Sequence, residues 1–303
     1  MRLLALKVDV DTWRGTLEGV PNLVRILRKH TADATFLFSL GPDHTGRAIR
    51  RVFRPGFMSK VSRTSVLEHY GWKTLLYGTL LPGPHIAQRG RNILLDVAAH
   101  GFETGIHTWD HIKWQDFVAR KSPEWTRQEM QLAHESYVDV FNADPPTHGA
   151  AGWQMNDSAY RQETDWGMAY CSDTRGPAPF VPLLADGTAA CVQLPTTLPT
   201  LDELIGLDGI DAGTVAGRVL ALTEAESATG HVYTLHAELE GMKLASAFEA
   251  LLSGWRQQGY RLVSLAGLYA ALDVAALPRR RVGMGTLPGR SGTLAMPLDT
   301  PHA

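Results

Sequence analysis

Short apolar runs alternate with amphipathic stretches along most of the chain. The first run, Leu3–Val10, is almost wholly apolar and leads into Asp9 and Asp11, as in a buried strand with acidic side chains at its carboxyl end. Pro21 follows at a position suited to the first turn of a helix, and apolar residues recur at helical spacing over 23–29. The pattern therefore predicts a strand followed by a helix.

The same alternation continues to residue 263. It predicts strands at 34–40, 102–107, 168–172, 191–194, 232–236 and 261–263, and helices at 92–99, 126–141 and 245–257. Repeated strand–helix units imply parallel strands with helices outside them. No internal repeat accompanies the units. Their number favours an α/β fold of the (β/α) barrel type, with an open doubly wound sheet as the alternative.

Two stretches depart from this rhythm. Residues 47–63 hold six basic residues and no acidic one, interleaved with large apolar residues. This basic amphipathic pattern is typical of a segment that lies on a membrane surface, and equally of a solvated loop packed on an acidic body. From Pro278 onward the chain is rich in Arg, Gly and Pro and has little to bury. We expect residues 278–303 to form a flexible tail.

Composition limits the function classes. The 303 residues are 44% hydrophobic, enough for one large core or two ordinary domains, and the net charge of −2 gives no field of the kind that attracts nucleic acid. Cys171 and Cys191 are too few for a disulfide framework and suit a reducing compartment. We find no signal peptide and no apolar run of the roughly 18 residues that a spanning helix needs, and expect a cytoplasmic protein.

Ionisable residues stand at the carboxyl ends of several predicted strands, where barrel enzymes build their active sites. They are Asp9, Asp11, His107, His111 and His236. Residues two apart on a strand point to the same face, so Asp9 and Asp11 are able to share one cleft, where two such charges need a cation or a shared proton. The alternative is that this Asp-x-Asp pair only ends a strand or caps a turn.

The histidines extend this chemistry. His107 and His111 have the spacing of a metal-ligand pair, although such pairs also arise on ordinary helix surfaces. Two imidazoles and one carboxylate leave open positions for water and substrate on a catalytic divalent metal. His236 has the pKa range of a proton donor to a leaving amine, and Asp173 is placed either to orient such a histidine or to pair with Arg175.

The ordered set of motifs resembles the polysaccharide deacetylase superfamily, the NodB-homology carbohydrate esterases. The motifs are Asp9-Val10-Asp11, HTWDH from His107, Ser172-Asp173 and Leu235-His236. The longer strings VDVDTWRGTLEGVPNL, FLFSLGPDHTGR, YGWKTLLYGTLLPG, AAGWQ, YCSDTRG, LPTTLP and YTLHAELEG are similar to one branch, the deformylases of 4-deoxy-4-formamido-L-arabinose-phosphoundecaprenol in the lipid A aminoarabinose pathway of polymyxin resistance. The similarity covers about residues 3–272.

The resemblance implies a distorted (β/α) barrel over 1–277, with an insertion at about 47–90 that faces membrane and substrate. It implies one divalent cation (Zn, Mn, Co or Ni) and hydrolysis of an N-formyl group from a sugar on undecaprenyl phosphate. The alternatives are an N-deacetylase of another sugar and a non-catalytic carbohydrate- or lipid-binding module. The lipid substrate favours peripheral association with the cytoplasmic face of the inner membrane. We expect the membrane contacts to come from Arg50, Phe53, Arg54 and Phe57.

The resemblance also assigns roles residue by residue. It makes Asp9 the general base and His236 the general acid, and it makes Asp11, His107 and His111 the metal ligands. We add Asp173 to the catalytic set from its position at the end of a predicted strand. The chain departs from the superfamily where an Arg-x-Pro-aromatic motif is expected, because Ala150-Ala151-Gly152-Trp153 keeps the aromatic residue and lacks the arginine. Arg175 is the candidate that replaces it beside the base. Trp153, Arg175 and Arg14 are the expected substrate-binding residues.

Overall fold

A parallel sheet with a fully buried central strand organises the chain. The computed structural model describes residues 2–48, 74–287, 290 and 292–298. The strand order is β3-β2-β1-β7, and β8 pairs with the first residues of β1. The bounds are Leu3–Val10 for β1, Thr35–Ser39 for β2, Glu103–Thr108 for β3, His231–His236 for β7 and Arg261–Val263 for β8. Every residue of β1 is buried because neighbours lie on both of its edges and both of its faces.

Backbone hydrogen bonds also connect the two edge strands of this sheet, β3 and β7, through the segments between them. The parallel pair β4 (Tyr170–Cys171) and β6 (Val192–Gln193) stands between β3 and β7. The connecting bonds join Ile106 to Thr147, His148 to Ser172, Cys171 to Leu194 and Thr197 to Val232. Because β7 in turn pairs with β1, the ring closes. The predicted distorted (β/α) barrel is confirmed, with short bridges in place of full strands on one side.

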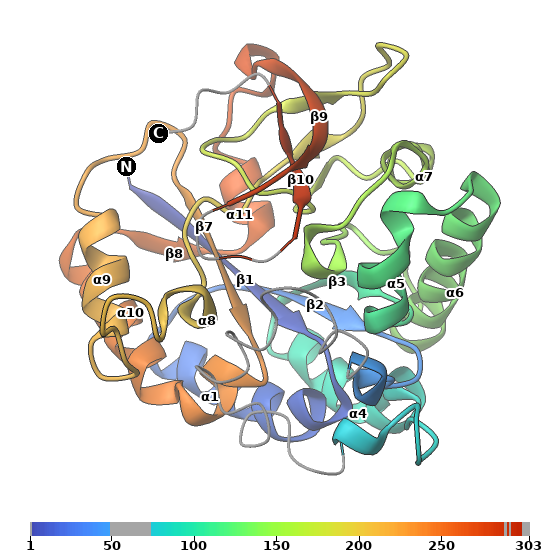
Figure 1. Ribbon diagram of the computed structural model, residues 1–303. Helices are drawn as coiled ribbons and strands as arrows, with labels where there is room; N and C mark the ends of the chain where they lie inside the picture. The colour runs from blue at the N-terminus through green and yellow to red at the C-terminus, as the bar shows by residue number, and fades with distance from the viewer. Residues whose placement is uncertain (1, 49–73, 288–289, 291, 299–303) are drawn as a thin grey trace.

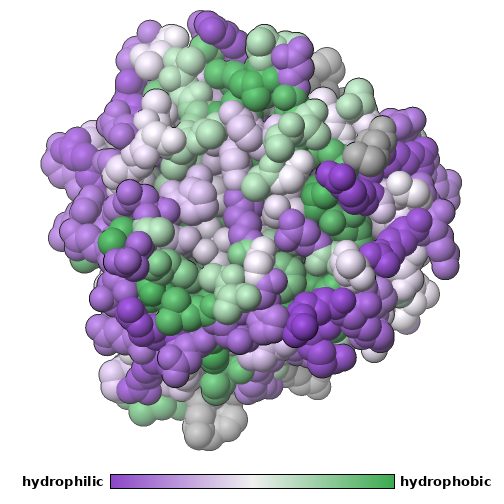
Figure 2. Space-filling view, turned by 180° about the vertical axis from the view of Figure 1, so that it is seen from behind, coloured by the Kyte–Doolittle hydropathy of each residue, from purple (hydrophilic) through white to green (hydrophobic). Residues whose placement is uncertain are grey.

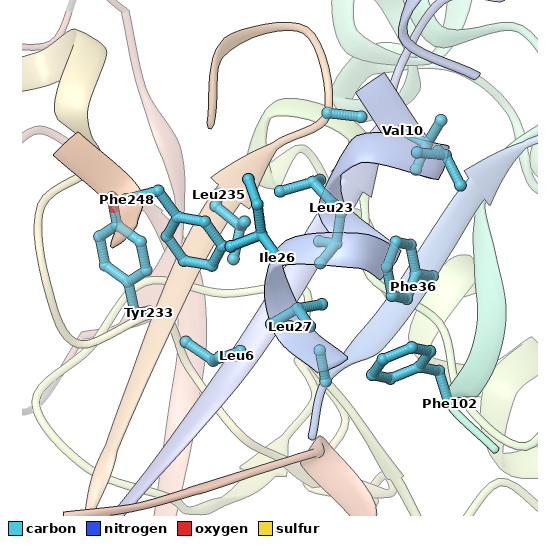
Figure 3. Packing of buried hydrophobic residues seen from close by; sticks show 14 of the residues in the cluster. Leu6, Val10, Leu23, Ile26, Leu27, Phe36, Phe102, Tyr233, Leu235 and Phe248 are labelled. Atoms are coloured by element: carbon cyan, nitrogen blue, oxygen red, sulfur yellow. The ribbon is translucent and has the colours of Figure 1, made fainter. Parts of the chain in front are cut away.

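Helices cover the outside of the barrel (Figure 1). In the described part of the chain they are α1 (Val20–Lys29), α4 (Ile86–Ala99), α5 (His111–Phe117), α6 (Pro123–Phe141), α7 (Asp157–Asp165), α8 (Leu201–Leu204), α9 (Val215–Leu222), α10 (Ala245–Gln257) and α11 (Leu265–Tyr269). Figure 3 shows Leu23, Ile26 and Leu27 of α1 lying on the strands, with Phe248 of α10 beside Tyr233 of β7. Each side chain of this size contributes about 2 kcal/mol when fully buried, so this layer anchors the strands.

The two faces of β1 separate packing from chemistry. Leu6, Val8 and Val10 belong to the apolar core between the strands and the helices. Lys7 and Asp9 alternate with them and therefore point into the barrel, where they are 0% and 3% exposed. The barrel interior thus carries buried charge at its carboxyl end, and the outer layer carries the hydrophobic stabilisation.

Most predicted elements have their expected positions, and α10 and β8 have the predicted bounds. Helix α4 begins at Ile86, six residues before the prediction, so the segment that joins β2 to α4 ends at His85 rather than near residue 90. A 3-10 turn, Thr74–Leu76, lies in this segment. Residues 49–73, with Arg50, Phe53, Arg54 and Phe57, lie outside the described residues.

The C-terminal segment differs from the expected flexible tail. Strands β9 (Arg279–Gly285) and β10 (Leu294–Pro297) pair antiparallel, and β9 also pairs with β5 (Val181–Leu183). All four residues of β10 are buried, and Leu294 and Met296 pack on Trp153. The segment has few apolar residues, but the hairpin directs them onto the barrel, and strand pairing satisfies its backbone. Figure 1 shows β10 beside the loop that leads to α7.

The surface is mixed in character. Figure 2 shows polar residues over much of the face opposite to that of Figure 1, with apolar residues gathered in separate patches. Within the described part of the chain, no helix combines the length and apolar character needed to cross a membrane.

Candidate active site

The turn after β1 fixes Asp11 beside the end of β7. A π-helical turn, Gly15–Gly19, packs closely on the segment that follows β7. A Cβ at Gly15 would lie 1.9 Å from Glu238 Oε1. Glu238 Oε1 accepts hydrogen bonds from the backbone N–H of Asp11, at 3.1 Å, and of Thr12, at 2.8 Å. Only glycine permits this approach, so the GTLEG sequence positions the acidic pair.

Asp11, His107 and His111 form a compact group of ligand atoms. Asp11 Oδ1 lies 3.2 Å from His107 Nε2, and Asp11 Oδ2 lies 3.4 Å from His111 Nε2. His107 Nδ1 donates to the carbonyl of Gly149 at 2.5 Å, so its Nε2 is the ring nitrogen that faces Asp11. Asp110 caps α5 by accepting the N–H of Lys113, which places His111 in the first turn of that helix.

The electrostatics of this group favour a cation. Burial opposes ionisation of Asp11, but the imidazoles of His111 and His107 outweigh it and hold the pKa of Asp11 well below its usual value. Asp11 Oδ1 and Asp9 Oδ1 are buried with no hydrogen-bond partner among the described residues. Two imidazoles, one carboxylate and an unsatisfied oxygen in reach fit a divalent cation such as Zn, Mn, Co or Ni with open coordination positions.

Asp9 lies beside this group and is held by Lys7. Lys7 Nζ is 3.4 Å from Asp9 Oδ2, donates to the carbonyl of Ser172 at 2.9 Å and lies 5.5 Å from the centre of the Trp153 ring. The side chain of Lys7 is fully buried. Sequence reasoning missed Lys7, although its position two residues before Asp9 on a strand already places it on the same face.

His236 completes the site from the neighbouring strand. It is the last residue of β7 and pairs in register with Asp9 of β1. Its N–H donates to Glu240 Oε2 at 2.9 Å, while its buried Nδ1 has no partner among the described residues. Burial alone would lower the pKa of His236, but the carboxylates of Asp11 and Asp202 raise it to about 9. A protonated imidazole beside the ligand group is suited to donate a proton.

Asp173 contacts neither of its two expected partners. Its Oδ1 accepts the N–H of Ala150 at 2.8 Å and lies 2.8 Å from His148 Nδ1, and its Oδ2 accepts from Gln193 at 2.7 Å. These bonds tie Asp173 to the loop that leads to Trp153 instead of to His236. His148, which the sequence analysis did not single out, also bonds Glu163 at 2.7 Å.

Arg175 is not the cation beside the base. Its Nη1 donates to Glu203 at 2.7 Å, and its other nitrogens bond the carbonyls of Thr196 and Leu198. Lys7 holds the position next to Asp9 that the sequence analysis assigned to Arg175. The difference arises because the side chain of Arg175 follows the barrel wall toward α8, a direction that residue order does not reveal.

Trp153 lies beside Lys7 of the site, and Arg14 lies three residues after Asp11 in the chain. The loop turns sharply at Gly152 and Trp153, which have φ values of 60° and 53°, and the buried indole donates to Thr196 Oγ1 at 3.1 Å. A positive φ at a bulky residue is a strained conformation that persists only when the surroundings enforce it. Arg14 pairs with Glu18 at 3.3 Å, both partly exposed.

Comparison with protein-family models found no match. Among solved structures, one from Mycobacterium smegmatis named as a polysaccharide deacetylase aligns over 94% of this chain and 96% of its own, with 16% identity and a TM-score of 0.63. The Xyl-CE4 domain of a xylanase from the hindgut metagenome of Trinervitermes trinervoides covers 89% of this chain and 90% of its own, with 14% identity and a TM-score of 0.51. The fold is therefore that of the CE4 polysaccharide deacetylases.

Two curated relatives are much more similar in sequence. Both are named "Probable 4-deoxy-4-formamido-L-arabinose-phosphoundecaprenol deformylase ArnD". The protein from Shewanella sediminis is 36% identical over 271 residues, 89% of this chain and 87% of its own. The protein from Wigglesworthia glossinidia brevipalpis is 32% identical over 282 residues, 93% and 97% of the two chains. The chain belongs to this deformylase family.

Proposed function

We propose that this protein hydrolyses the formamide of 4-deoxy-4-formamido-L-arabinose on undecaprenyl phosphate, giving the free amine and formate. The observation that carries the proposal is the meeting of Asp9, the Asp11–His107–His111 group and His236 at one end of the barrel. The substrate is the one named for the two relatives, and the family membership extends it to this chain. The product would serve lipid A modification and polymyxin resistance.

The residues divide the work of amide hydrolysis. Asp11, His107 and His111 would hold the divalent cation, which supplies a Lewis acid for the formamide carbonyl. Asp9 takes a proton from the attacking water, because its Oδ1 accepts no hydrogen bond from the described residues while its Oδ2 is held by Lys7. His236 gives a proton to the sugar nitrogen as the carbon–nitrogen bond breaks. One water is consumed, and its oxygen leaves in formate.

Backbone groups of the Trp153 loop are candidates to stabilise the oxyanion. The N–H of Trp153 already donates to the carbonyl of Ala150 at 3.0 Å. The N–H groups of Ala151 and Gly152 are therefore the donors we assign to the tetrahedral intermediate, and the bond from Ala150 N–H to Asp173 fixes the loop that carries them. In this assignment Asp173 is a positioning residue.

Mass spectrometry of the formamido-arabinose lipid phosphate, incubated with purified protein, tests the proposal. We expect loss of the formyl group, abolished by a chelator and restored by added divalent metal. The matching acetamido lipid should react far more slowly, because its acyl group carries an extra methyl and a small acyl pocket would exclude it. Equal rates on both would favour a general N-deacetylase, and no reaction on either would refute the proposal.

We further propose that the protein works at the cytoplasmic face of the inner membrane as a peripheral protein. The undecaprenyl chain of the proposed substrate remains in the bilayer, so the enzyme must approach the surface. The basic amphipathic pattern of 47–63 supports this approach, with Arg50, Phe53, Arg54 and Phe57 as the contacting residues.

A further inference from the structure

Three cationic side chains surround the buried ring of Trp153. The Arg290 guanidinium carbon lies 4.3 Å from the ring centre, that of Arg175 lies 4.9 Å away, and Lys7 Nζ lies 5.5 Å away. Tryptophan is the best aromatic partner for cations. Arg290 lies between β9 and β10 in the sequence, and Leu294 and Met296 of β10 pack on the same Trp153.

The hydrogen-bond donors of the two arginines are not all filled by the described residues. Arg175 donates to Glu203 and to two carbonyls, so each of its three nitrogens makes a hydrogen bond. Glu203 also closes the capping box of α8 with Thr200. Asp202, the other carboxylate of α8, accepts from Thr200 and raises the pKa of His236, so it acts on the active-site histidine.

Arg290 makes fewer hydrogen bonds with the described residues than Arg175 does. Its Nη1 adds a second hydrogen bond to Glu203 Oε1, at 2.8 Å, and its side chain keeps 14% exposure. Within the described residues its Nε and Nη2 have no hydrogen-bond partner. A guanidinium that is held against an indole, with one edge filled and another open, is preorganised to bind an oxyanion in a fixed orientation.

We propose that Arg290, held by Trp153 and Glu203, is a subsite for the phosphate of the lipid-linked sugar. This inference rests on the proposed function. Lys7 contacts both Asp9 and the Trp153 ring, so Lys7 and the indole together link the base to Arg290. In the proposed substrate a single pyranose ring separates the C4 formamide from the C1 phosphate. The substrate thus carries its formamide and its phosphate on one sugar ring, and the protein carries its base and Arg290 around one Trp153 ring.

The alternative is that Arg290 only ties the hairpin to α8. Two substrates separate these roles: the formamido-arabinose on a short polyprenyl phosphate, and the methyl glycoside of the same formamido sugar, which lacks phosphate. We compare Arg290→Gln with Arg279→Gln, an exposed arginine on β9 that serves as the matched control. Arg290→Lys tests whether charge without the planar fork suffices.

We expect Arg290→Gln to raise KM for the phosphate substrate with little change in kcat. A lost charge-assisted hydrogen bond corresponds to roughly a tenfold to hundredfold rise in KM. KM for the methyl glycoside, which has no phosphate, should stay nearly unchanged in Arg290→Gln. Arg290→Lys should recover part of the lost affinity for the phosphate substrate. Arg279→Gln should leave both KM values unchanged. An equal penalty on both substrates, or none, would overturn the subsite.

Direct binding keeps the test independent of turnover. Calorimetry with a short polyprenyl phosphate that carries no sugar should show binding to wild type, weakened about tenfold or more in Arg290→Gln. Inorganic phosphate as competitor distinguishes a lipid phosphate from the free anion. If wild type cleaves neither sugar but still binds the polyprenyl phosphate through Arg290, the proposed function fails and the phosphate subsite stands. Equal binding by wild type and Arg290→Gln would overturn the subsite.

Discussion

At the residue scale, the three proposed metal ligands act as a unit. Replacing Asp11, His107 or His111 by Ala should remove bound metal and activity together, since two remaining ligands hold an open-site cation poorly. Elemental analysis of each purified variant, alongside its turnover, measures both effects. A variant that kept stoichiometric metal and normal turnover would exclude that residue from the ligand set.

Asp9→Asn is the matched control, because it is nearly isosteric and removes only the proposed base. Turnover should fall by a factor of roughly 100 or more while metal stays bound, and His236→Ala should behave likewise. Loss of metal from Asp9→Asn would make Asp9 a ligand and reassign the acidic pair.

Lys7 supplies the second test at this scale. Lys7→Met keeps the length and removes the charge, leaving the buried Asp9 carboxylate without its cation. We expect kcat to fall roughly tenfold to a hundredfold, and the free energy of unfolding to fall by about 3 kcal/mol, because a buried charge that loses its partner is costly. Kinetics and denaturant unfolding measure these changes.

The control for Lys7 is Lys7→Arg, which retains the positive charge. Its kcat should exceed that of Lys7→Met, although a Cβ at Gly149 would lie only 2.9 Å from Lys7 Cε, so the larger side chain fits tightly. Unchanged kcat in Lys7→Met would show that Asp9 works without a neighbouring cation.

At the scale of secondary-structure elements, the sequence predicted what local pattern determines. The alternation of Leu6, Lys7, Val8 and Asp9 specifies a strand with two distinct faces, and β1 has the predicted bounds. The paired strands β9 and β10 escaped prediction because their burial depends on the distant Trp153 and on pairing with β5. Local hydrophobicity carries no record of such contacts.

The candidate site shows the same division. The meeting of Asp11, His107 and His236 could be predicted from the sequence, since each stands at or just after the end of a strand and parallel strands bring such residues to one rim. The partners of Arg175 and Asp173 do not follow, because each bonds residues that only the closed barrel brings near: Glu203 in one case, His148 in the other. Side-chain direction at a strand end, rather than strand order, decides these contacts.

His148 links the loop before Trp153 to α7, and its protonation makes the free energy of unfolding depend on pH. Burial opposes its charge, but Asp173 and Glu163 outweigh burial and raise the pKa of His148 to about 10. The folded protein therefore binds a proton that the unfolded chain releases near pH 6.5. The contribution of His148 to stability is complete below pH 6.5 and is lost as pH rises toward 10.

We therefore expect the free energy of unfolding to fall between pH 7 and pH 10, and His148→Gln to flatten this fall by at least about 1 kcal/mol. Denaturant unfolding of both proteins at several pH values measures the slope. The Arg279→Gln change serves as control, since this arginine is exposed on β9 and its replacement leaves the contacts of His148 with Asp173 and Glu163 intact. A slope identical in wild type and His148→Gln would contradict the assigned proton.

At the scale of the whole molecule, the positive charge is local. The net charge is −2, yet residues 47–63 contain six basic residues and no acidic one. The rest of the chain is therefore acidic, and an anionic membrane would attract one region and repel the remainder. Such a distribution orients a protein on a surface. For a substrate anchored by an undecaprenyl chain, an oriented approach would bring the barrel rim to the sugar.

We predict partly salt-sensitive binding to anionic liposomes through this segment. Each cation near the surface contributes about 1 kcal/mol, and inserted Phe side chains add a hydrophobic contribution that salt does not screen. Arg50→Glu with Arg54→Glu should weaken binding chiefly at low salt, whereas Phe53→Ser with Phe57→Ser should weaken it at all salt concentrations.

Co-sedimentation measures the bound fraction, and bound metal confirms that the active site of each variant is intact. The matched control is Arg279→Glu with Arg281→Glu, which makes the same charge change at exposed positions of β9. If this control weakened binding as much as the change in 47–63, net charge alone would explain the association. Wild-type protein that stayed in the supernatant at low salt would remove the segment from any membrane role, and the lipid-linked sugar would then have to reach the barrel rim by another surface.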